Sequence, residues 1–86
     1  MLKKTELRDA VYGWIKSLPD GTIFRHSDTY RFLETHFDRE CSQRGDAKRE
    51  PRYKNDARWA VQDALGKTPG KDQITEKVGF ATFRRL

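Results

Sequence analysis

The sequence predicts a single α+β domain spanning residues 1–86, and three observations carry this prediction. The chain has only 86 residues, which leaves no room for a second hydrophobic core. Apolar residues recur at helical spacing near the start and in the third quarter of the chain, whereas they alternate near its end. Five Phe, three Tyr and two Trp offset a hydrophobic content of only 35%, because each aromatic side chain buries a large area.

The first helix is predicted over residues 5–18. Its apolar residues fall on one stripe, at intervals of three and four: Leu7, Ala10, Val11, Trp14, Ile15 and Leu18. Thr5 is the expected N-cap, and Pro19 and Gly21 end the helix. The short segment 21–25, which is apolar and partly β-branched, predicts a strand.

A second helix is predicted to start at Ser27. This residue is the expected N-cap, and Asp28 suits the positive N-terminal end of the helix. Tyr30, Leu33 and Phe37 form its predicted buried side. Residues 38–50 (DRECSQRGDAKRE) are polar and lack an apolar period, so we expect a loop there.

The third helix is predicted over residues 51–65, with Pro51 in its first turn. Its inner stripe consists of Tyr53, Ala57, Ala60, Val61, Ala64 and Leu65. The three alanines are small and allow another helix to approach closely. The segment 66–70 (GKTPG) ends it. The tail alternates around Gly79, with Ile74 and Val78 before it and Phe80 and Phe83 after it, and predicts a terminal β-hairpin.

The predicted order of elements is helix, strand, helix, helix, strand, strand (α-β-α-α-β-β). This order is typical of a winged helix, in which a three-helix core carries a small antiparallel sheet. The last hairpin of that sheet forms the wing. The sequence therefore predicts an α+β winged helix.

The net charge of +5 is unevenly distributed along the chain. Residues 1–38 contain six basic and six acidic residues, whereas residues 39–86 contain twelve basic and seven acidic ones. A basic half joined to a neutral half favours one face that binds a polyanion. An ordinary solvated basic surface is the alternative.

The side of the third helix opposite its apolar stripe has the composition of a DNA-reading surface. Arginine suits guanine, and asparagine or glutamine suits adenine, in the major groove. The predicted base-reading residues are Arg52, Asn55, Arg58 and Gln62. The predicted phosphate contacts are Arg49, Lys54, Lys77 and Arg84. We expect double-stranded DNA as the partner, although a solvated helix face would show the same residue types.

Trp59 also lies on the outward side of this helix. We expect it to pack on the wing hairpin or on the loop before the helix, as large aromatics usually do. Stacking on a sugar or an exposed base is the alternative.

The stretch EPRYKNDARWAVQDAL (residues 50–65) resembles the third helix of winged helix-turn-helix domains that accompany Mrr-like and HNH-type restriction endonucleases. The segment RHSDTYRFLE (residues 25–34) is similar to their second helix. The resemblance implies DNA binding, with Arg52, Lys54, Asn55 and Arg58 at the contact face. The sequence departs from the family after Leu65, where GKTPGKDQ replaces an immediate aliphatic strand, so the wing contacts are not carried over.

We expect no catalytic activity, cofactor, metal or small-molecule substrate. Asp20, Asp46 and Lys48 match the loose PD…(D/E)xK nuclease pattern, but turns and loops would not align them around Mg²⁺. His26, His36 and Cys41 lack a fourth ligand at a suitable spacing. A single cysteine favours a reducing, cytoplasmic setting, and no apolar run predicts a membrane span.

The competing hypothesis is a protein–protein interaction module on the same scaffold. Asp46, Glu50, Asp56 and Asp63 lie in or just before the third helix, where they would dilute a basic face. RNA binding is a lesser alternative, because A-form major grooves exclude side chains. A homodimer, or a nuclease or other protein partner, stays open, as does excision of this domain from a longer protein.

Overall fold

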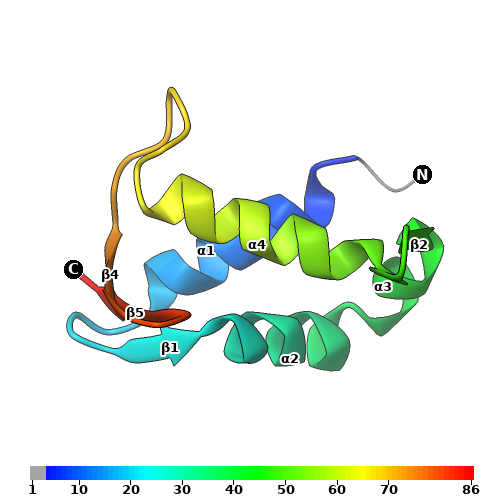
Figure 1. Cartoon of the computed structure of the whole chain (residues 1–86), viewed down its shortest axis with the longest axis horizontal. Helices are drawn as coiled ribbons and strands as arrows, with labels where there is room; N and C mark the ends of the chain where they lie inside the picture. The colour runs from blue at the N-terminus through cyan, green and yellow to red at the C-terminus, as the bar shows by residue number, and fades with distance from the viewer. Residues whose placement is uncertain (1–3) are drawn as a thin grey trace.

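The computed structural model describes residues 4–86 (Figure 1). Along the chain lie α1 (Glu6–Ser17), β1 (Ile23–Arg25), α2 (His26–His36), α3 (Asp38–Arg44), β2 (Asp46–Ala47), β3 (Glu50–Pro51), α4 (Arg52–Ala64), β4 (Thr75–Gly79) and β5 (Thr82–Arg85). The described residues therefore form an α+β fold with four helices and two small antiparallel sheets, which confirms the α+β part of the prediction.

The core lies where α1 and α4 run alongside each other, with α2 packed below them (Figure 1). The predicted stripes of α1 and α4 supply most of its buried side chains: Leu7, Val11, Ile15, Ala57, Ala60, Val61 and Ala64. The alanines of α4 are fully buried, so the two helices approach closely. The apolar periodicity therefore predicted both helices and their inner sides correctly.

The main sheet has the strand order β1-β5-β4, with both pairs antiparallel. Phe83 of β5 pairs with Phe24 of β1, and their rings lie 5.6 Å apart on the core side. Lys77 is the other cross-strand partner of Phe83, and cross-strand partners share a face of the sheet. Lys77 therefore lies on the same face of the sheet as Phe83, although its side chain is exposed. Glu76 and Arg84, which pair with each other, lie on the opposite face, which we call the outer face of the sheet.

The expected loop at residues 38–50 was wrong. This segment forms α3 and the short β2–β3 hairpin, with Gly45 (φ 68°) between them. The helix has only seven residues and buries one apolar side chain, Cys41, so no apolar period reveals it. An ion pair between Arg44 and Asp56 of α4 fastens it to the core.

Thr5 occupies the N-cap position of α1 as predicted, but the predicted cap of the second helix was wrong. Thr5 makes no capping hydrogen bond, and its hydroxyl instead donates to the Asp9 carboxylate at 3.2 Å. The N-cap of the second helix is Arg25, two residues before the predicted Ser27, so Ser27 lies within the first turn. There Asp28 accepts a hydrogen bond from the backbone N–H of Arg25 at 2.8 Å. A carboxylate three residues into the helix caps it in place of the serine.

The C-terminal hairpin forms as predicted, with its turn at Phe80 and Ala81. Only part of its apolar set is buried. Ile74 and Phe83 join the core, whereas Val78 and Phe80 are exposed.

Candidate nucleic-acid interface

The side of α4 opposite the buried alanines carries Arg52, Asn55, Trp59 and Gln62, as the sequence predicts. We call these four residues the outer face of α4. Arg52 and Trp59 are exposed and the two amides are half-buried, so their polar groups reach the surface. Arg58 and Lys54 lie at the flank toward α2, where the Lys54 ammonium is 5.4 Å from the Tyr30 ring centroid.

The two aspartates of α4 point inward. Asp56 is 8% exposed and accepts two hydrogen bonds from Arg44, at 2.7 and 2.9 Å. Asp63 is fully buried and accepts two from Arg8 of α1, at 2.7 and 2.6 Å, and one from the Thr68 hydroxyl at 2.5 Å. Each carboxylate is neutralised by an arginine outside α4, so neither dilutes the charge of the outer face.

Asp63 stays ionised in this setting. Burial alone would raise its pKa, but hydrogen bonds from Arg8 and Thr68 and the positive charges of Arg8 and Lys71 lower the pKa below its usual value. The two hydrogen bonds to Asp63 hold the Arg8 side chain in place, and its guanidinium lies 5.4 Å from the centroid of the Trp59 ring.

Trp59 was expected to pack on the wing hairpin or on the preceding loop, whereas the contact that the structure shows for its ring is with Arg8 of α1. The ring is 55% exposed and has the Arg8 guanidinium over its face. A cation–π contact from the neighbouring helix supports the side chain from one side. The rest of the ring forms part of the outer face of α4.

Arg58 is held by three acceptors. Its guanidinium donates to the Tyr30 hydroxyl at 2.9 Å, to the Asn55 side-chain oxygen and to the Glu50 carboxylate. The hydrogen bond to Glu50 raises the pKa of Arg58, so the cation is permanent. A base or phosphate would have to displace Glu50 to reach the guanidinium.

A hollow of about 230 Å³ lies at the middle of the outer face, between α4 and the start of α2. Its lining residues are His26, Asn55, Arg58, Trp59 and Gln62. Sequence reasoning placed His26 only at a helix start. No local pattern marks it as a site residue, because its neighbours in the hollow lie far along the chain.

His26 brings the C-terminal hairpin close to this hollow. Its ring meets Phe83 edge-on, with centroids 5.1 Å apart, and its Nδ1 is buried without a hydrogen-bond partner in the described structure. Burial, followed by the positive charges of Arg58 and Lys77, lowers the pKa of His26. The imidazole is therefore neutral at pH 7, between two cations.

A second hollow, of about 540 Å³, lies at the N-terminal end of α4, where the turn between β2 and β3 passes Asn55. Lys48 and Arg49 form this turn and are exposed. Arg52 donates to the backbone oxygen of Asp46 at 3.1 Å, so the turn and the helix start are joined. Lys48 was missed as a site residue, although the basic run that includes Arg49 marks it.

The predicted site residues thus fall into two groups. The structure brings Asn55, Arg58 and Gln62 together on α4, with Lys54 at the flank and Arg49 and Arg52 at the N-terminal end of the helix. Lys77 is the cross-strand partner of Phe83, whose ring contacts His26 of the hollow. Arg84 is separate from them. It lies on the outer face of the sheet, beside Ile23, and pairs with Glu76 at 3.0 Å.

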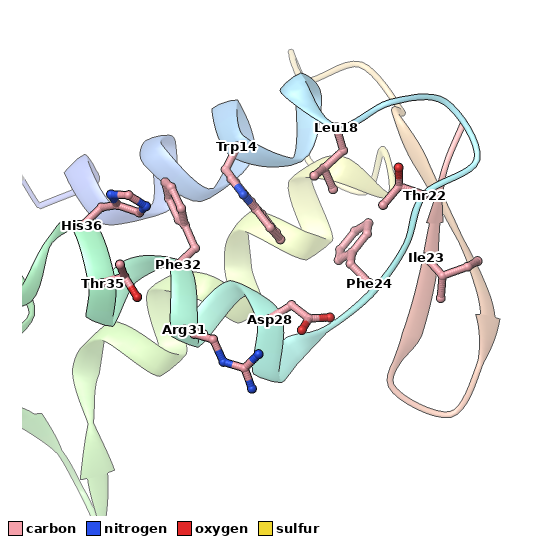
Figure 2. Close-up of a pocket in the computed structure, with 10 residues that line it drawn as sticks. All are labelled: Trp14, Leu18, Thr22, Ile23, Phe24, Asp28, Arg31, Phe32, Thr35 and His36. Atoms are coloured by element: carbon pink, nitrogen blue, oxygen red, sulfur yellow. The ribbon is translucent and has the colours of Figure 1, made fainter.

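A different hollow, of about 400 Å³, has an apolar floor (Figure 2). It is lined by residues of α1, α2 and the segment through β1, and by none of α4. Trp14 and Phe32 stack there with centroids 5.4 Å apart, next to Phe24 (Figure 2). Ile23, at its rim, is 54% exposed.

Within residues 4–86 no cluster of three or more metal-ligating side chains occurs, and no helix is long and apolar enough to cross a membrane. Comparison with known proteins gives no matching family model, curated protein or solved structure.

Proposed function

We propose that this chain is a winged-helix domain that binds double-stranded DNA through α4, as a stand-alone regulator or an accessory module. One observation carries the proposal. The outer face of α4 presents arginine and amide side chains, while the two aspartates of the same helix are turned inward and ion-paired. The helix therefore combines groups that read base edges with no uncompensated carboxylate of its own.

The topology supports the winged-helix part of the proposal. Apart from α3, β2 and β3, the elements follow the order helix, strand, helix, helix, strand, strand. In the sheet order β1-β5-β4, β5 is central and β4 is at the edge, and we assign the C-terminal β4–β5 hairpin as the wing. The segment α3–β2–β3 is then an insertion before the recognition helix. The resemblance of residues 25–34 and 50–65 to restriction-associated domains agrees with this assignment.

In the proposed complex α4 lies in the major groove, whose width of about 12 Å matches a helix with its side chains. Arg52, Asn55 and Gln62 contact base edges. Arg49 and the neighbouring Lys48 contact phosphates at the N-terminal end of the helix. Lys77 does so from the hairpin at the far side of the hollow.

The test is a salt-dependent titration of labelled duplex DNA. The variant Lys48→Ala/Arg49→Ala removes the two cations proposed to contact phosphates at the N-terminal end of α4. The control Lys16→Ala/Arg39→Ala removes two exposed cations from α1 and α3, outside it. We expect weaker binding for the first variant and a log–log salt slope shallower by about 2, because each phosphate contact contributes about 0.9. Equal effects of both variants, or no binding at low salt, would refute the proposal.

The apolar hollow of Figure 2 favours a second candidate, a protein-interaction module. Its stacked Trp14 and Phe32 and the exposed Ile23 suit an apolar side chain of a partner. This candidate becomes the better one if duplex DNA fails to bind.

A further inference from the structure

The turn of the β4–β5 hairpin carries the most exposed large apolar side chain in the described structure. Phe80 is 96% exposed and takes no part in the core. The core already contains Phe24 and Phe83 of the same sheet, so Phe80 has no role in the packing of the domain. The phenyl ring at the end of the hairpin is therefore available for contact with a ligand.

The backbone of the turn that carries this ring has a defined geometry. Ala81 has a positive φ of 50°, which is uncommon for a residue with a side chain. The Thr82 hydroxyl donates to the Phe80 backbone oxygen at 2.8 Å and closes the turn. The ring therefore projects from the end of a closed turn.

The stem below the ring is basic. Lys77 lies in β4, and Arg25 of β1 is the cross-strand partner of Thr82. Both are exposed. An apolar tip between cations complements a ligand that offers an apolar slot between negative charges. The step between two stacked base pairs, with a phosphate on each strand, has this character.

The position of the tip fits the same duplex that α4 would hold. The pairing of Arg25 with Thr82 sets the tip beside the start of α2, as Figure 1 shows. His26, the next residue, lines the hollow on the outer face of α4. A duplex with its major groove on α4 therefore passes its backbone, and then its minor groove, by the hairpin.

We infer that Phe80 is a wedge that enters the minor groove and partly unstacks one base-pair step beside the segment held by α4. The inference rests on the proposed DNA binding. Pyrimidine–purine steps unstack most easily, so the wedge would give the protein a preference for TA or CA/TG steps. This preference would come from the low cost of deforming these steps rather than from contacts with base edges.

The test uses duplexes with 2-aminopurine placed in turn at each position of a TA-containing site, since its fluorescence rises on unstacking. We expect wild-type protein to raise the signal several-fold at one position, and Phe80→Ala to abolish that rise. Phe80→Leu, still an apolar wedge, retains part of it. Val78→Ala is the matched control, because Val78 is an exposed apolar residue on the strand, and it leaves the rise intact.

Two negative results are distinguishable. If wild-type protein binds the duplexes but no position brightens, or if Phe80→Ala brightens the same position equally, the wedge is refuted and DNA binding stands. If wild-type protein does not bind, both proposals fail. Circular dichroism and thermal melting of Phe80→Ala should match wild type, because the ring contributes nothing to the core.

Discussion

Replacing Asp63 with asparagine should destabilise the domain more than any surface change of the same kind. The carboxylate is fully buried and receives two hydrogen bonds from Arg8 and one from Thr68. Removing one partner of a buried ion pair costs about 3–5 kcal/mol. The amide of the variant would keep the volume and one acceptor, and the Arg8 side chain is 28% exposed to water. We therefore expect a loss of about 2–3 kcal/mol.

Thermal and urea denaturation measure this loss. In a domain of this size it corresponds to a fall in Tm of roughly 10–20 °C. Asp20→Asn is the matched control, because Asp20 is 88% exposed and lies 4.0 Å from Arg85. The control should stay within about 0.5 kcal/mol of wild type. If Asp63→Asn behaves like Asp20→Asn, the ion pair does not stabilise the contact between α1 and α4 and the reasoning is refuted.

The pH dependence provides a second measurement of the same ion pair. The folded-state pKa of Asp63 is lowered from its ordinary value of 3.8. The ionised carboxylate therefore contributes its stability fully above the unfolded-state pKa, and the contribution disappears as pH falls through the folded-state value. The difference in stability between wild type and Asp63→Asn should be constant near neutral pH and should shrink only below about pH 4. A difference that shrinks near pH 6 would point to another group.

Three further predictions concern single residues. Glu50→Gln should tighten duplex binding roughly 3- to 10-fold at low salt, because it frees Arg58 and removes a negative charge from the interface; weaker binding in anisotropy titrations would show that Glu50 positions the guanidinium instead. Gly66→Ala should cost at least about 1–2 kcal/mol in urea denaturation, since Gly66 has φ +80° and an added Cβ would lie 2.9 Å from the Gln73 Cβ; wild-type stability would contradict the close approach. Cys41 should react with a thiol reagent at pH 8 far more slowly than free cysteine, because burial raises its pKa to about 11, and denaturant should restore the rate; a fast reaction in the folded protein would contradict its burial.

The apolar stripes of α1 and α4 could be predicted because each helix is long enough to show its period. The buried positions Val11 and Ile15, and Ala57 and Val61, repeat at four-residue spacing in the sequence itself. The outer face of α4 followed from the inner one, since a helix with one buried side leaves the other side to solvent. These features depend only on local sequence.

The missed features depend on contacts between distant residues. In the sequence Asp56 and Asp63 are acidic residues at the edge of a basic face. In the structure Arg44 pairs with Asp56 and Arg8 pairs with Asp63, and both arginines come from other helices. The support of Trp59 by Arg8 is of the same kind. Spacing within one helix carries no information on which residue of another helix will approach.

The two sides of α4 differ in how well they tolerate substitution. Ala57, Ala60 and Ala64 are fully enclosed, so any larger side chain there would push α1 away and cost stability. Arg52 is exposed, and Asn55 and Gln62 are only half-buried, so packing constrains these positions less. Under the proposed DNA binding, new side chains at these three positions would alter the bases that α4 contacts while leaving the fold intact. If α4 binds DNA as proposed, exchange of these few surface residues would change the sequence preference, and a combinatorial library at these positions would measure its range.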